Sequence, residues 1–278
     1  MLGKLLKHEF RATGRTMLPI YAAVLALAVL GNLSIRFVQN TNSTFLRILF
    51  GLLFGAFVIG MIAAAIMTLV MMISRFYRNL LKDEGYLMHT LPVNVHGLVW
   101  SKLIVSFVWF LATFLILWLV IMLSALLQSG TNLAEIFQGL PSWAEIRAML
   151  AQLDIHSGQL WALGLSLLAA AHLSCLTGCL HFYASMSLGH MFSKDTVLLS
   201  IVFFVVISIA LSMLSTGYSA VVFRGYVDME LEGGWEVFKE VLALMQNITL
   251  RVMAVELVQG ALLYLDTVLG LKKGLNLA

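Results

Sequence analysis

Charged residues and prolines are scarce in this 278-residue sequence, with 11% Asp, Glu, Lys and Arg and three prolines in all. Soluble domains have about 25% charged and about 45–50% apolar residues, whereas this chain is 61% apolar. A water-soluble fold could not bury that much apolar surface. In lipid every backbone polar group must be paired within the protein, which helices achieve on their own. The sequence therefore predicts an all-α polytopic membrane protein.

Cysteine and the common catalytic motifs are also scarce or missing. The two cysteines, Cys175 and Cys179, lie in one apolar stretch, which excludes a disulfide framework. No G-x-x-x-x-G-K-[ST] occurs, so the chain has no phosphate-binding loop, and H-E-x-x-H and G-x-S-x-G are missing too. We therefore expect that the chain is not an enzyme and contains no cofactor of its own.

Long apolar runs are abundant, and a membrane span needs about 20 such residues. Six stretches qualify as transmembrane helices, and the sixth is interrupted by polar side chains that include Glu256 and Gln259. The six stretches are Met17 to Val38, Leu46 to Ile73, Leu98 to Leu127, Leu160 to Leu188, Val197 to Leu214 and Ile248 to Leu271.

The distribution of basic residues predicts the orientation. An even number of spans places both termini on one side, and 11 of the 17 Lys and Arg residues lie on that side. Loops rich in Lys and Arg stay in the cytoplasm. We expect a multi-pass protein of the cell membrane with both termini cytoplasmic.

The polar segments complete a single permease domain over residues 1–278. Residues 1–16 are amphipathic and predict a cytoplasmic helix in the membrane interface. Residues 74–97 form the one substantial cytoplasmic loop, and residues 128–158 and 215–247 are the extracellular segments.

Both extracellular segments contain helical patterns. In the first, Ser142 and Glu145 have the spacing of a capping box, which predicts a helix start. In the second, Trp235, Phe238 and Leu242 form an apolar stripe after a Gly-Gly pair. In this second segment, which lies between spans five and six, we expect short helices.

Two groups inside the spans are candidates for chemistry. His172, Cys175 and Cys179 share a helical face, where they could hold a soft metal or pack as small groups at a helix contact. Small neighbours favour packing, so we expect no metal, and the role of the three residues stays open. Glu256 lies deep in a span, where a carboxylate usually faces a partner or a water-filled path. It either lines a translocation path with Gln259 or pairs structurally with Gln259 or Arg251.

The cytoplasmic loop has the sequence DEGYLMHTLPV from Asp83 to Val93. This segment resembles the corresponding loop of ABC-2 type permeases of Gram-positive bacteria. The start, LLKHEFRATGR from Leu5, and the ending, LKKGLNL from Leu271, are similar to those of the same family, which includes lantibiotic-immunity and phenol-soluble-modulin exporter permeases.

The resemblance implies that two permeases pair, as a homodimer or heterodimer, and that the loop is a coupling helix bound to a cytosolic ABC ATPase. ATP and Mg would then bind that ATPase, and no nucleic acid is expected as a partner. The residues of this chain in the ATPase contact would be Asp83, Glu84, Gly85, Tyr86, Leu87 and Pro92.

The function expected on this basis is that of the transmembrane subunit of an ATP-driven exporter. It would move amphipathic or antimicrobial-type peptides out of the cell or membrane by alternating access. The alternative is a non-transporting membrane anchor or sensor that binds a cytosolic partner, because the same loop and basic face would serve it.

Overall fold

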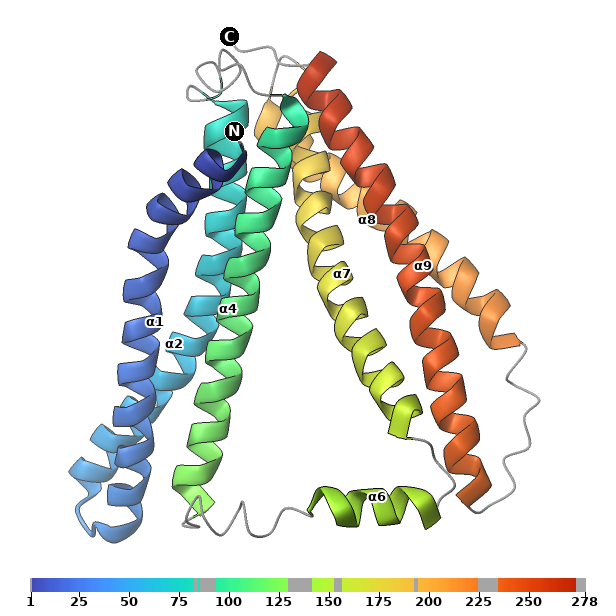
Figure 1. Ribbon diagram of the computed structural model, residues 1–278. Coiled ribbons are helices and arrows are strands. Elements are labelled where there is room, and N and C mark those ends of the chain that lie inside the picture. The colour runs from blue at the N-terminus through green and yellow to red at the C-terminus, as the bar shows by residue number, and fades with distance from the viewer. Residues whose placement is uncertain are drawn as a thin grey trace. The chain divides into compact units, whose positions relative to one another are not determined.

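The computed structural model describes residues 2–82, 85, 94–129, 142–152, 157–192, 195–224 and 235–273. All regular structure in these ranges is helical (Figure 1). The elements are α1 (Leu2–Asn40), α2 (Thr44–Phe76), the π-helix η1 (Tyr77–Leu81), α4 (Val95–Ser129), α6 (Trp143–Gln152), α7 (Ser157–Gly189), α8 (Thr196–Arg224) and α9 (Trp235–Lys273).

Six of these helices are long and apolar enough to cross a membrane, which confirms the predicted all-α architecture and the number of spans. The spanning portions are Leu2–Ile35, Thr44–Leu81, Val95–Leu127, Gly158–Gly189, Thr196–Tyr218 and Lys239–Lys272. Each is longer than the apolar stretch that predicted it, because polar residues at the span ends continue the helix.

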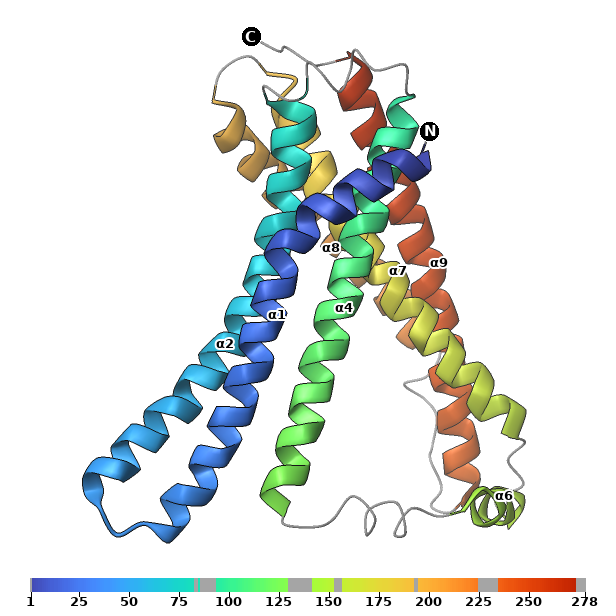
Figure 2. The same ribbon diagram turned by 60° about the vertical axis from the view of Figure 1, so that its left-hand side comes forward.

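The N-terminal segment is part of a longer helix than the sequence suggested. Residues 2–16, expected as a separate interfacial helix, belong to α1, which runs without interruption from Leu2 to Asn40. Pro19 lies inside α1 and has no N–H for the helical ladder, which kinks a helix locally. Figure 2 shows the first turns of α1 leaning away from the axis of the rest.

The two predicted extracellular segments have different outcomes. The capping box is confirmed, since Ser142 N donates to Glu145 Oε2 over 2.6 Å and Glu145 N donates to Ser142 Oγ over 3.2 Å at the start of α6. The hydrogen bonds from Ser142 lower the pKa of the exposed Glu145 carboxyl below its usual range. In the second segment, residues 215–224 belong to α8 and residues 235–247 to α9. The structure thus has long helices where we expected separate short ones.

The chain divides into two compact units. Residues 1–76 and 100–140 form the first, and residues 77–99 and 141–278 form the second. We expected a single domain from the sequence, whereas the chain divides into two units with three candidate spans each. The boundaries fall where α2 meets η1 and inside the first turns of α4.

In the first unit, α1 packs along α2, and α4 completes the core. Two apolar clusters lie in succession along α1, which contributes Met17 and Tyr21 to one and Val24 and Ala28 to the other. Trp109 of α4 packs in the first cluster and Phe57 of α2 in the second.

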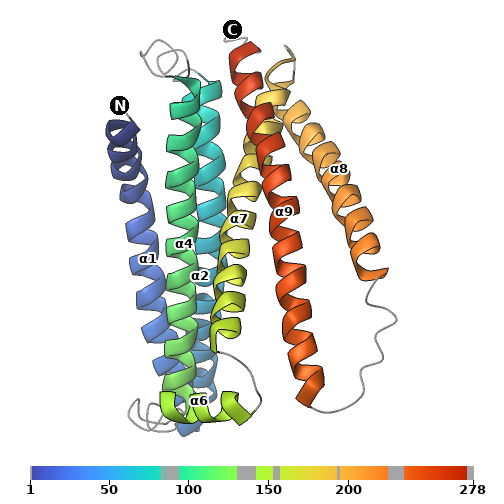
Figure 3. The same cartoon turned by 45° about the vertical axis from the view of Figure 1, so that its right-hand side comes forward.

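In the second unit, α7 packs against both α9 and α8, and the three helices converge toward the C-terminal end of α9 (Figure 3). Ser166 Oγ of α7 donates a hydrogen bond to Gln246 Oε1 of α9, and Ser187 Oγ donates one to Thr267 O. In both pairs the two residues are 80 positions apart in the sequence. A constant separation means that α7 and α9 run parallel, as spans four and six must.

The orientation predicts the result of reporter fusions. Fusions at Asn42, Gly139 and Gly233 should all report the extracellular side, because the 11 basic residues on the N-terminal side retain that side in the cytoplasm. The measurement is the activity of a paired alkaline phosphatase and green fluorescent protein at each site. A cytoplasmic signal at any one of the three sites would contradict the six-span topology.

Candidate functional site

The structure describes the residues that flank the proposed coupling segment on both sides and one residue within it. Asp83, Glu84, Tyr86, Leu87 and Pro92 lie outside the described residues, and Gly85 is the one member of the set within them. Gly85 is buried, and its N–H donates to Lys82 O over 2.6 Å. A Cβ at Gly85 would lie 2.7 Å from Leu80 O, so a larger residue at this position would force the backbone to shift.

Both ends of this segment are held by helices of the second unit. On the η1 side, the Tyr77 ring meets the His190 ring edge-on, with centroids 5.3 Å apart. On the α4 side, His96 Nδ1 is hydrogen-bonded to Tyr264 Oη over 2.7 Å. Burial lowers the pKa of His190, and nearby Lys82 lowers it further, while a hydrogen bond to Met186 O opposes the shift. His190 is therefore held neutral at the point where η1 packs on the end of α7.

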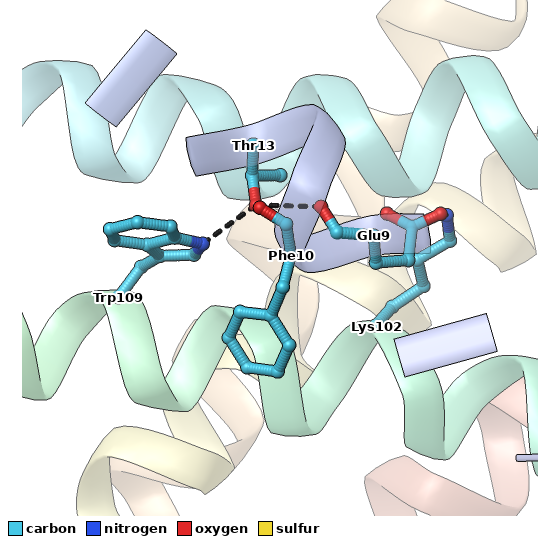
Figure 4. A network of polar contacts seen from close by, with 5 residues as sticks. All are labelled: Glu9, Phe10, Thr13, Lys102 and Trp109. Atoms are coloured by element: carbon cyan, nitrogen blue, oxygen red, sulfur yellow. Dashed lines mark hydrogen bonds and ion pairs between the residues drawn. The ribbon is translucent and has the colours of Figure 1, made fainter. Parts of the chain in front are cut away.

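A line of polar contacts joins α1 to α4 inside the first unit (Figure 4). It begins with an ion pair between Lys102 Nζ and Glu9 Oε1, whose side chains are 2% and 8% exposed. One turn further along α1, Thr13 Oγ1 accepts a 2.7 Å hydrogen bond from Trp109 Nε1 and donates to Glu9 O over 2.8 Å. The Phe10 ring packs 6.4 Å from the Trp109 ring. These contacts fix the N-terminal part of α1 on α4.

The same line continues along both helices. Tyr21 Oη and Thr113 Oγ1 are 2.7 Å apart, and Thr68 of α2 joins them at 2.8 Å from Thr113. Beyond them, Asn32 Nδ2 donates to Ser124 Oγ over 2.8 Å. In these four pairs the α4 partner is 92 to 96 positions after the α1 residue, so α1 and α4 run parallel along this polar line.

The Glu9–Lys102 pair was missed by the sequence analysis. Glu9 lies within residues 1–16, which were expected to form an interfacial helix, and Lys102 lies near the start of the third predicted span. One signal was present, because Lys102 is the only charged residue between Leu98 and Leu127. A small cavity of about 10 Å³, lined also by Arg75, lies beside the pair and has room for roughly one water molecule.

Glu256 lies between α9 and α7 in the second unit. Ser174 Oγ donates to its Oε1 over 3.0 Å, and Thr177 Oγ1 hydrogen-bonds its Oε2. The partners are therefore hydroxyl groups of α7 and not Gln259 or Arg251, the two structural partners considered from the sequence. Glu256 and Gln259 are both half-buried. The carboxylate is thus held in place by neutral donors, and no ion pair joins it to a cation in the described parts of the chain.

The His172, Cys175 and Cys179 side chains are not gathered into a ligand set. His172 Nδ1 is 2.5 Å from Leu168 O on its own helix, and Cys179 is buried. Among the described residues, no group of three His, Cys, Asp or Glu side chains has a metal-binding arrangement. The His181 ring instead stacks on the Phe204 ring, with centroids 4.4 Å apart, and its Nε2 is hydrogen-bonded to Phe204 O over 3.2 Å.

Comparison with known proteins gives no relative: no family model, no curated protein and no solved structure matches the chain.

Proposed function

We propose that this chain is the transmembrane subunit of an ATP-driven ABC exporter whose ATPase is a separate polypeptide. The observation that best supports this is the division of the chain around the cytoplasmic segment. Tyr77 and His96, near the two ends of the segment, contact His190 at the end of α7 and Tyr264 of α9, whereas α2 and most of α4, which lead into and out of the segment, belong to the other unit. A protein that pulled on this segment would act on both units at once.

The element at that boundary suits movement. η1 is a π-helix of five residues that directly follows α2, and such irregular turns often occur at functional hinges. An ATPase bound to Asp83, Glu84, Gly85, Tyr86, Leu87 and Pro92 would transmit its closure through η1 into α2. This residue set derives from the family resemblance and the length of the loop.

A second permease copy is part of the proposal. In the described chain, the most apolar part of α8, within Thr196–Tyr218, has no buried residues. Several of its apolar side chains, Ile201, Met213 and Leu214 among them, are more than half exposed. This surface is available to lipid and to a second copy of the chain.

The substrate class proposed is a cationic amphipathic peptide. A carboxylate held by Ser174 and Thr177 in a low-dielectric span attracts a cation strongly because little water screens it. Glu256 and Gln259 would then line the translocation path, which accounts for a deeply placed carboxylate that has no cationic partner in α7.

Glu256→Gln should reduce peptide export several-fold while leaving the thermal unfolding temperature nearly unchanged. The amide keeps the size and can still exchange hydrogen bonds with Ser174 and Thr177, so only the charge is lost. The measurement is export of a labelled cationic helical peptide from cells. Asp266→Asn is the matched control, because it removes the same charge from an exposed position of α9. Normal export by a folded Glu256→Gln protein would restrict this residue to a structural role.

The experiment that tests the function is affinity purification of the tagged chain from its own membranes, followed by an ATP hydrolysis assay. We expect an ABC ATPase to copurify and its hydrolysis to respond to added peptide. A non-transporting anchor would also retain a cytosolic partner, but hydrolysis in that complex would not respond to any peptide.

A further inference from the structure

A basic hollow lies on the outer face of α1, just before Pro19. It has a volume of about 430 Å³ and is lined by Phe10, Arg11, Gly14, Arg15, Leu18 and Pro19. Residues 11, 14, 15 and 18 share one helical face by their spacing. Gly14 is buried and adds no side chain between the two arginines, and the Trp109 ring lies 3.8 Å from the position of a Gly14 Cβ.

Both arginines of the hollow are exposed. They are four positions apart on one helix, an arrangement in which like charges repel each other. The described residues of the first unit contain eight Lys and Arg against one acid, a net charge of +7, and that acid is Glu9. Because Glu9 is buried and paired with Lys102, this unit has no described carboxylate that neutralises the hollow.

Apolar surface continues from the hollow along the same face of α1. Leu18, Leu25, Val29 and Leu33 follow at helical spacing and are 63%, 39%, 47% and 44% exposed. Ala22 lies between Leu18 and Leu25 on this face and is exposed as well. Its short side chain makes the surface shallower there than at the two leucines. The face therefore has a basic end and an apolar stripe that leads away from it into the span.

From this arrangement we infer that the hollow binds one anionic phospholipid, with its phosphate between Arg11 and Arg15 and an acyl chain along the Leu18 to Leu33 stripe. Guanidinium groups form paired, charge-assisted hydrogen bonds with phosphate, which relieves the repulsion between the two arginines. A free phosphate would satisfy the arginines but leave the apolar stripe unused. This inference does not depend on the proposed export function.

The probe is native mass spectrometry of the full chain in detergent with equal amounts of phosphatidylglycerol and phosphatidylcholine. The wild type should retain phosphatidylglycerol preferentially, and Arg11→Gln/Arg15→Gln should lower that preference by roughly tenfold, since the basic residues supply the lipid charge recognition. Lys4→Gln/Lys7→Gln removes the same charge from exposed positions of the same helix and should keep most of the preference. An equal loss in both double variants would overturn the site, because binding would then follow net charge alone.

A second pair of variants tests the shape of the hollow without changing charge. Gly14→Leu fills the space between the arginines and should reduce lipid retention, whereas the Cβ of Gly14→Ala makes only ordinary contact with Trp109 and should leave retention intact. This pair decides the question if the arginine variant fails to fold. Unchanged retention in Gly14→Leu would overturn the inference. Displacement of the lipid by millimolar inorganic phosphate would overturn the lipid as occupant and assign the hollow to a free anion.

Discussion

Lys102→Met should lower the free energy of unfolding by about 3–5 kcal/mol, the loss found when one partner of a buried ion pair is removed. The Lys102 and Glu9 side chains are 2% and 8% exposed, so the substitution leaves a carboxylate in an apolar environment without its cation. Arg75 lines the same small cavity and can turn toward the carboxylate, which places the expected loss at the lower end. Chemical denaturation in mild detergent measures the change.

Two variants complete this experiment. Glu9→Gln in addition to Lys102→Met removes both charges, and replacing a buried pair by neutral groups is often nearly neutral, so most of the stability should return. Lys4→Met removes an exposed charge from the same helix, and surface substitutions usually change stability by less than about 0.5 kcal/mol. A loss in Lys102→Met no greater than in Lys4→Met would refute the buried pair.

Tyr86→Glu and Leu87→Glu should each abolish the stimulation of the partner ATPase by peptide. Both residues are apolar anchors of the proposed coupling helix, and an unpaired charge in an interface costs several kcal/mol. We expect the ATPase to copurify poorly and its hydrolysis rate to fall to that of the free subunit. The spans should stay folded, because both residues lie in the sequence between the second and third predicted apolar stretches.

Asn94→Asp is the matched control for these two variants. It adds the same charge at an exposed position at the end of the same loop, and aspartate can still cap α4, where Asn94 Oδ1 accepts from His96 N over 3.4 Å. Coupling should therefore be retained in this variant. If Tyr86→Glu and Leu87→Glu also retain wild-type coupling, the ATPase contact lies elsewhere.

The number of spans and the α6 start were predictable because both are local signals. Long apolar runs identify spans by length alone, and the Ser142 to Glu145 box requires only four consecutive residues. The length of α9 was not predicted, because Glu236, Lys239 and Glu240 suggested a surface helix. No Pro or Gly separates that stretch from the sixth span, so the helix continues through it.

The polar contacts could not be predicted, because they join distant residues. Glu9 and Lys102 are 93 positions apart, and each alone has the pattern of a charge at a span end. Glu256 was expected to need a partner inside a span, but its donors are about 80 positions away on α7 and are ordinary Ser and Thr residues. A charged residue inside an apolar helical stretch indicates that it needs a polar partner. The sequence pattern does not identify which residue is that partner.

We propose that the chain transports substrate with energy from a separate ATPase, and transport into inside-out vesicles tests this claim most directly. Vesicles that contain the chain and its copurified ATPase should accumulate a labelled cationic amphipathic peptide when ATP and Mg are added. The accumulation should disappear when the ATPase cannot hydrolyse ATP and fall several-fold with Glu256→Gln. Vesicles that hydrolyse ATP through the assembled complex, yet accumulate none of a panel of such peptides, would contradict the claim and favour the anchor or sensor instead.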